Sequence, residues 1–158
     1  MSPEMARDEA AAGRFVEDFA AVMVESGMPR IAARVFAYLL AAEEASATAA
    51  ELAERLQVSP AAVSGAVRYL IQVRLVFRDR VPGQRRDTYR VGNDLWYEVL
   101  GTRDQEIVRW ADLTRRGAAS VGLDTAAGRR LSETSEFFDF LRVELQEVTR
   151  RWKEQQGR

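Results

Sequence analysis

The sequence predicts a mainly α-helical fold with one small β-hairpin. Apolar residues recur at helical spacing through most of the 158 residues, whereas residues 76–91 have the pattern of strand, turn and strand around Pro82-Gly83. The composition, 47% hydrophobic and 30% charged, is that of one globular domain and includes no uninterrupted apolar run long enough to span a bilayer. We therefore expect a single domain over residues 1–158, located in the cytoplasm and without a membrane partner.

The first two helices are predicted over residues 4–26 and from Pro29 onward. Phe15, Phe19 and Met23 recur at four-residue spacing in the first, which ends at Ser26-Gly27. Pro29 suits the first turn of the second helix. That helix carries an apolar stripe formed by Ile31, Val35, Tyr38 and Leu39.

Two short helices are then predicted to meet across a tight turn. Thr48 and Glu51 have the spacing of a capping box, and Ser59-Pro60 is an N-cap followed by the residue best tolerated at the first helical position. In the second of these helices, the face opposite the apolar one consists of Pro60, Ala61, Ser64, Gly65 and Arg68. A solvated surface helix normally carries Glu, Lys or Gln, so these small side chains predict a partner that approaches the backbone closely.

A β-hairpin is predicted next, and most of its charge is positive. Arg85 and Arg86 fall at or just past the tip, with three further arginines along the strands: Arg78, Arg80 and Arg90. Asp87, beside Arg86, is expected to pair with an arginine and hold it in place.

Two longer helices complete the chain. The first runs from Asn93 to about Gly117, and after a break Asp124 is expected to cap a last helix that reaches about Lys153. That last helix has an a/d repeat, which predicts a partner helix: Thr134, Phe138, Leu141, Leu145, Val148 and Trp152.

Charge is segregated along the chain, although the formal total is only −1. Residues 55–90 hold eight arginines against two aspartates, a formal charge of +6, which leaves −7 for the rest. A basic block in an acidic frame is typical of a surface that binds a polyanion. A solvated arginine-rich surface is the alternative, which charge alone does not exclude.

Composition also excludes several kinds of chemistry. The chain has neither cysteine nor histidine, so disulfides, thiolate or imidazole metal sites, cysteine nucleophiles and Ser-His-Asp triads are ruled out. The only lysine, Lys153, lies near a predicted helix C-terminus, where it complements the helix dipole. We expect no catalytic residue, no metal and no cofactor.

Helix, turn, helix and hairpin in this order form a winged helix-turn-helix, in which the second helix enters the DNA major groove and the hairpin reaches the minor groove or backbone. Ordinary surface exposure is the alternative for Arg68, and pure capping for Ser59. The predicted partner is double-stranded DNA, and the predicted contacts are Thr48, Ser59, Pro60, Ala61, Ser64, Arg68, Arg78, Arg80, Arg85, Arg86 and Arg90.

The stretch GMPRIAARVFAYLL, together with TAAELAERLQVSPAAVSGAVRYLIQVRLVFRDRVPGQRRDTYRV, resembles the MarR superfamily of bacterial transcriptional regulators and, within it, the GbsR-like branch. The likeness covers residues 27–92, and the flanking helices in arrangement only. It implies a homodimeric repressor that binds pseudo-palindromic DNA, with a winged core at about 28–92 and dimerisation helices at about 4–26 and 93–156. Relatives often have glycine where Gln57 and Arg74 stand here, and a left-handed backbone at either position costs a side chain about 1 kcal/mol relative to glycine.

The resemblance also implies roles for the terminal helices. They are expected to form the dimer interface through Phe15, Phe19, Met23, Phe138, Leu141, Leu145, Val148 and Trp152. A pocket for a small-molecule effector is expected where they meet the winged part, with the aromatic candidates Tyr38, Trp96, Tyr97 and Trp110. The alternative is that these aromatic side chains fill the core.

Two other functions compete with DNA binding. One is a winged-helix protein–protein adaptor that does not bind DNA, and the other is a small enzyme that depends on carboxylates or tyrosine. An adaptor has no need for a +6 block, and no paired acids mark a catalytic pocket. Charge segregation therefore favours the DNA-binding regulator.

Overall fold

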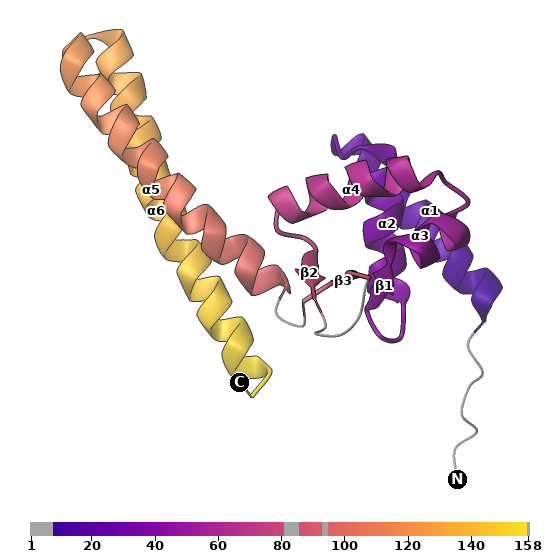
Figure 1. Ribbon diagram of the computed structural model, residues 1–158. Helices are drawn as coiled ribbons and strands as arrows, with labels where there is room; N and C mark the ends of the chain where they lie inside the picture. The colour runs from indigo at the N-terminus through magenta and orange to yellow at the C-terminus, as the bar shows by residue number, and fades with distance from the viewer. Residues whose placement is uncertain (1–7, 81–85, 93–94, 158) are drawn as a thin grey trace. The chain divides into compact units, whose positions relative to one another are not determined.

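The computed structural model describes residues 8–80, 86–92 and 95–157, except for the side chains of residues 95–102. The elements of this described part are α1 (Glu9–Glu25), α2 (Arg30–Ala41), β1 (Ser46–Thr48), α3 (Ala49–Leu56), α4 (Pro60–Gln72), β2 (Phe77–Asp79), β3 (Thr88–Arg90), α5 (Leu95–Val121) and α6 (Ala126–Gln155) (Figure 1). They form two compact units, Met1–Leu95 and Trp96–Arg158. The predicted fold class, mainly helical with a small β component, is confirmed.

Helices α1 and α2 pack against each other at the start of the first unit. The Asp8 carboxylate caps α1 by accepting a hydrogen bond from the Ala11 amide at 3.0 Å. Val16 and Ala20 of α1 are buried, whereas the Phe15 side chain stays exposed and stacks on Phe19 with ring centroids 5.5 Å apart. Helix α1 therefore keeps part of its apolar surface outside this unit's core.

The core of the first unit centres on α2, which also contacts α4. Val35, Phe36 and Leu39 of α2 are fully buried, together with Leu52 of α3 and Leu70 of α4. Large apolar side chains from three successive helices thus share one core, and this core fixes α3 and α4 relative to each other.

Left-handed backbone residues bracket α4. Helix α3 ends at Leu56 and its C-cap residue, Gln57, has φ 52°, while Arg74, just after α4, has φ 59°. Between them the Ser59 hydroxyl accepts a hydrogen bond from the Ala62 amide at 3.2 Å and starts the helix at Pro60. The left-handed conformation considered for Gln57 and Arg74 is confirmed at both positions.

The small sheet has three strands, whereas the sequence predicts only two. All pairs are antiparallel in the order β1-β3-β2, and Tyr89 in the central strand lies opposite Ala47 on one side and Arg78 on the other. The Val91 amide extends this pairing by donating to the Ala45 carbonyl at 2.9 Å. Strand β1 has three residues, too few for the alternation of apolar and polar residues that marks a strand in sequence. The hairpin is consequently tied to the segment between α2 and α3, and the predicted Pro82-Gly83 turn lies outside the described residues.

The second unit is an antiparallel pair of long helices, α5 and α6 (Figure 1). The sequence predicts a break from about Gly117 and a cap at Asp124, but α5 continues to Val121 and the N-cap of α6 is Thr125. The Thr125 hydroxyl accepts a hydrogen bond from the Gly128 amide at 2.9 Å. A connection this short leaves room only for a glycine at position 128, because a Cβ there would lie 2.0 Å from the Gly122 carbonyl oxygen.

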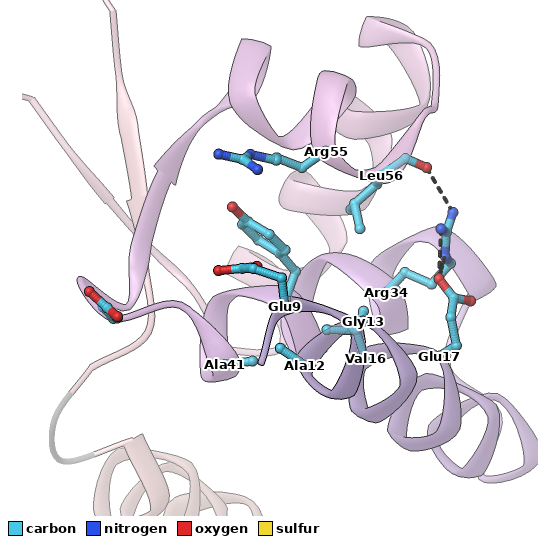
Figure 2. A pocket seen from close by; sticks show the side chains of 11 residues that line it. Glu9, Ala12, Gly13, Val16, Glu17, Arg34, Ala41, Arg55 and Leu56 are labelled. Carbon is cyan, nitrogen blue, oxygen red and sulfur yellow. Dashed lines mark hydrogen bonds and ion pairs between the residues drawn. The ribbon is translucent and has the colours of Figure 1, made fainter. Parts of the chain in front are cut away.

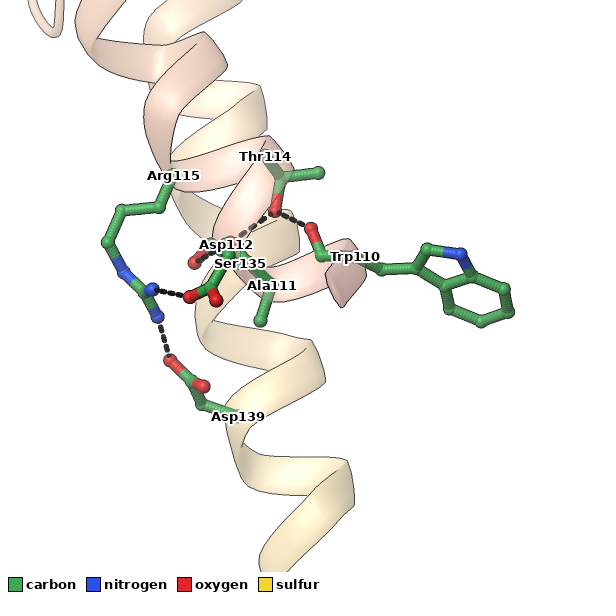
Figure 3. Close-up of polar contacts among 7 residues, drawn as sticks. All are labelled: Trp110, Ala111, Asp112, Thr114, Arg115, Ser135 and Asp139. Carbon is green, nitrogen blue, oxygen red and sulfur yellow. Dashed lines mark hydrogen bonds and ion pairs between the residues drawn. The ribbon is translucent and has the colours of Figure 1, made fainter. Parts of the chain in front are cut away.

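The Arg115 and Trp110 side chains of α5 extend in different directions from the helical pair (Figure 3). On one side Arg115 joins Asp112 and Asp139 at 2.8 and 2.6 Å, and across the seam the buried Ser135 hydroxyl donates to the Ala111 carbonyl at 3.1 Å. The Trp110 side chain extends the other way and lies 5.4 Å from the Phe138 ring, centroid to centroid. No helix in the described part of the chain is both long and apolar enough to cross a membrane.

Candidate nucleic-acid interface

Helix α4 separates its two faces as the sequence predicts. Val63, Ala66, Val67 and Leu70 are buried, whereas five residues on the opposite face are exposed: Pro60, Ala61, Ser64, Gly65 and Arg68. A Cβ added at Gly65 would meet nothing within 4 Å, so packing within the described part of the chain does not require a glycine there. The exposed face of α4 thus carries small side chains and one long cationic side chain, so another molecule is able to approach the backbone of the helix closely.

Three of the hairpin arginines, Arg78, Arg80 and Arg90, form ion pairs within the hairpin. Arg78 Nε donates to Asp87 at 2.7 Å, its Nη2 contacts the same carboxylate, and Arg80 Nε reaches the other oxygen of Asp87 at 3.3 Å. Arg90 Nε donates to Asp79 at 2.5 Å, and the guanidinium carbon of Arg90 lies 5.2 Å from the centroid of the Phe77 ring. The predicted pairing of Asp87 with an arginine is confirmed for two arginines.

Asp87 takes its electrostatic environment from these contacts. The hydrogen bond from Arg78 is the main cause that holds the pKa of the Asp87 carboxyl below its ordinary value, with Arg80 adding to the effect. The same contact raises the pKa of Arg78. Arg80 nevertheless presents most of its side chain to solvent, at 81% exposure, so it combines one internal ion pair with an open surface.

Thr48 is the N-cap residue of α3. Its hydroxyl accepts from the Glu51 amide at 3.3 Å, while the Glu51 carboxylate accepts from the Thr48 amide at 2.7 Å. This backbone hydrogen bond is the main cause that lowers the pKa of Glu51, and Arg86 also contributes by charge. Arg86 is exposed. The prediction for Arg85 lies outside the described residues.

Sequence reasoning missed one acidic partner of the basic hairpin. Asp79 forms an ion pair with Arg90. In the register of β2 against β3, Asp79 lies opposite Thr88, so its ion pair with Arg90 runs diagonally across the two strands. Only a known strand register could have revealed that contact.

The predicted dimer residues lie in both units, and many keep exposed apolar surface. In α1, Phe15 is exposed and Phe19 and Met23 are partly buried. In α6, Val148 and Trp152 are exposed, whereas Phe138, Leu141 and Leu145 are partly buried. These residues have apolar surface available for a partner, and their role in a dimer remains a prediction.

The predicted pocket residues are described only in part. Tyr38 is half-buried and lines a cavity of about 410 Å³ between α1, α2 and α3 (Figure 2). Trp110 belongs to the second unit and is 47% exposed, so it does not fill the core of that unit. The side chains of Trp96 and Tyr97 lie outside the described residues. A shared pocket for these aromatic residues stays a prediction.

This arrangement is that of a winged helix protein: a capped helix, then a second helix whose exposed face consists mostly of small side chains, and then a basic hairpin. Residues 26–87 match the MarR family model, and residues 94–155 match a model described as MmpR5-like MarR family transcriptional regulator. The chain therefore contains MarR family transcriptional regulator domains. No match was found among curated proteins.

Comparison with solved structures supports the fold. A crystal structure described as a transcriptional regulator is 23% identical, with a TM-score of 0.80 over 91% of this chain and 99% of its own. A mutant of MepR from a multidrug resistant S. aureus clinical isolate is 14% identical, covering 84% of this chain and 90% of its own, with a TM-score of 0.42. An apo mutant of Lactococcus lactis ZitR is 20% identical over 85% and 96%, with a TM-score of 0.36. Of these three, only the first supports a detailed likeness of fold.

Proposed function

We propose that this chain is a homodimeric, sequence-specific DNA-binding repressor that is released from its operator by a small-molecule ligand. Helix α4 lies in the major groove, and the hairpin arginines reach the minor groove of a pseudo-palindromic site. The observation that carries the proposal is the exposed face of α4, which consists of small side chains and Arg68 and is followed along the chain by a basic hairpin. The GbsR-like branch stays a prediction that neither matched family model tests.

The roles of the residues follow from their chemistry. Ala61 and Pro60 offer apolar contact to a thymine methyl group, Ser64 offers one hydroxyl, and Arg68 is able to bind a guanine or a phosphate. The free amides of the first turn of α4 favour a phosphate. Arg86 is exposed and carries the positive charge of the hairpin toward DNA.

A homodimer fits the apolar surface that each unit keeps exposed. Two-fold symmetry would place two copies of α4 one helical turn of DNA apart, about 34–36 Å. We propose no catalytic role for any residue.

The test is the salt dependence of binding to duplex DNA, measured by fluorescence anisotropy. We expect log affinity to fall with log salt at a slope of about −0.9 per neutralised phosphate, and the double variant Arg85→Ala, Arg86→Ala to flatten that slope. Arg109→Ala, an exposed arginine of α5, is the control and should leave the slope unchanged. Affinity that does not vary with salt would reject the proposal. An absence of duplex binding combined with a stoichiometric protein partner would favour the adaptor.

A further inference from the structure

The helical pair α5 and α6 has two outer edges, one on each helix, that face away from the contact between the helices. Along this contact Ala111 of α5 and Ser135 of α6 are buried, and the Ser135 hydroxyl donates to the Ala111 carbonyl at 3.1 Å (Figure 3). A residue two positions further along either helix lies about 160° away around the helix axis, and so on its outer edge. The two outer edges point in opposite directions, because each faces away from the other helix.

The outer edge of α5 is apolar and positively charged. Leu113 lies two residues after Ala111, with Arg109 four residues before it and Arg116 three residues after it, on one face of the helix. All three side chains are exposed, and Leu113 is exposed at 59%. Neither arginine forms an ion pair with another residue of the described part of the chain. We call Arg109, Leu113 and Arg116 the α5 ridge.

The outer edge of α6 is apolar and negatively charged. Phe137 lies two residues after Ser135, and Phe140 follows it one turn later, with exposures of 56% and 60%. Glu133 and Glu144 flank the two rings, one turn away on either side, and both are exposed. Among the described residues, neither glutamate has an ion-pair partner. We call Glu133, Phe137, Phe140 and Glu144 the α6 ridge.

The α6 ridge points in a different direction from the face proposed for the dimer. The two sets of residues point on average about 90° apart around α6. The dimer set on this helix is Phe138, Leu141, Leu145, Val148 and Trp152. A protomer bound to the dimer face therefore need not cover the α6 ridge.

We propose that the α5 ridge of one copy of this chain packs on the α6 ridge of a second copy, with the two helices parallel. Burial of the leucine and the two phenylalanine rings removes apolar surface from water, and the charges that flank these side chains are opposite on the two ridges. An aromatic ring face also attracts a guanidinium group. In the proposed register each α5 residue lies level with the α6 residue 24 positions later: Arg109 with Glu133, Leu113 with Phe137, and Arg116 with Phe140.

Glu106 favours the parallel orientation over the antiparallel one. It is exposed on α5, one turn before the α5 ridge. In the parallel register Glu106 lies level with the exposed Arg130, an opposite charge. An antiparallel register that places Leu113 beside Phe140 would put Glu106 level with Glu147, a like charge.

The proposed contact joins copies of the chain without closing on itself. Because the two outer edges point in opposite directions, one neighbour is unable to cover both ridges of the same copy. Each contact therefore leaves one α5 ridge and one α6 ridge uncovered, and such a heterologous contact is able to repeat. It would join dimers side by side, which is an assembly beyond the two-fold dimer. Exposed ion pairs contribute little individually, so we expect this association to be weak and to require high protein concentration.

The test is sedimentation velocity of the full chain, without DNA, over a range of concentrations. We expect the wild-type chain to form species larger than a dimer as its concentration rises. The double variants Arg109→Glu, Arg116→Glu and Glu133→Arg, Glu144→Arg should each weaken this association on the order of tenfold, because like charges then meet. An equimolar mixture of the two variants should restore it, since each supplies the charges that the other has lost.

Matched variants control for net charge and for loss of apolar surface. Charge reversals at exposed positions of the first unit should leave the association unchanged: Arg30→Glu with Arg68→Glu, and Glu44→Arg with Glu54→Arg. Leu113→Ser should weaken the association, whereas Leu123→Ser, at a leucine exposed at 60% between α5 and α6, should not. Circular dichroism would verify that each variant remains helical.

Three results would overturn the proposed contact. One is a wild-type chain that never exceeds a dimer, and another is a mixture no larger than its two components. The third is a double variant that becomes monomeric where the wild-type chain is dimeric, because the ridges would then belong to the dimer interface. None of these results concerns DNA, so the proposed function is tested separately.

A single charge reversal tests the orientation. Glu106→Arg should weaken the association severalfold in the parallel register, because it then meets Arg130, and mixing with Arg130→Glu should restore it. In the antiparallel register the new arginine would meet Glu147 and strengthen the association. A stronger association of Glu106→Arg would thus contradict the parallel orientation.

Discussion

The backbone conformations of Gln57 and Arg74 determine how the chain enters and leaves α4. Each adopts the left-handed region, at φ 52° and 59°, where a side chain is strained and glycine is not. The chain changes direction at these two residues and so enters and leaves α4 along fixed paths. Family resemblance identified both positions, because glycine is common there in relatives.

Replacing Gln57 with glycine should relieve this strain. We expect Gln57→Gly to raise the free energy of unfolding by about 0.5–1 kcal/mol, measured by urea denaturation. Gln105→Gly, at an exposed position inside α5, should lower it by a similar amount, because glycine is unfavourable within a helix. A loss of stability in Gln57→Gly would contradict the assignment of strain.

The pKa of Asp87 tests the hairpin ion pairs. It should lie below the ordinary aspartate value, and Arg78→Ala should raise it more than Arg80→Ala does, because the Arg78 hydrogen bond is the larger cause. A lowered pKa stabilises the folded state above the unfolded pKa, so this contribution is lost as pH falls through the folded value. Carbon-detected NMR titration of the carboxyl group measures both effects, and an unshifted pKa in the wild-type chain would contradict the pairing.

At the scale of elements, sequence patterns predicted helices and their faces well. Four apolar residues of α4 are buried and five residues opposite them are exposed, because a long amphipathic pattern fixes which side faces the core. Strand β1 escaped prediction because three residues carry no periodicity. The cap at Thr125 instead of Asp124 depended on how tightly α5 and α6 are joined, which local sequence does not specify.

The predicted site was recovered in outline only. The exposed residues of α4 and the pairing of Asp87 followed from pattern and neighbourhood in sequence. The contact between Arg90 and Asp79 did not, because it depends on strand register. The resemblance suggested Tyr38 as a pocket residue, but the lining from α1 and α3 was not predicted, because it depends on how the helices pack. Contacts between segments that are far apart in the sequence were therefore not predicted.

Two glycines in helices should respond oppositely to alanine. At Gly128 a Cβ would collide with the Gly122 backbone, so Gly128→Ala should lower the free energy of unfolding by roughly 1–3 kcal/mol. At Gly65 the space is open, so Gly65→Ala should raise it by roughly 0.5–1 kcal/mol. Thermal or urea denaturation of the two variants checks this, and a change of the same sign in both would contradict the close approach at Gly128.

At the scale of the whole molecule, apolar surface on α6 bears on assembly. Val148 and Val143 are exposed at 46% and 56%, and they lie about 140° apart around the helix. Val148 shares the face of Leu141, Leu145 and Trp152, which follow one another at spacings of three and four residues. This face has the continuous apolar character of an interface between helices.

A glutamate at each valine should separate the two faces. We expect Val148→Glu to shift the chain from dimer toward monomer, and Val143→Glu to leave the dimer intact, as measured by sedimentation equilibrium over a range of concentrations. Circular dichroism would verify that both variants remain helical. Dissociation by Val143→Glu alone, or a monomeric wild-type chain, would contradict the proposed interface.

The shared carboxylate of Asp87 has a consequence for how firmly the protein holds any polyanion. Arg78 and Arg80 already possess an internal anion, so a phosphate that takes either of them exchanges one negative partner for another. The net gain from such an exchange is smaller than that from a solvated arginine. Binding of a phosphate by Arg78 or Arg80 is therefore weak and readily reversed.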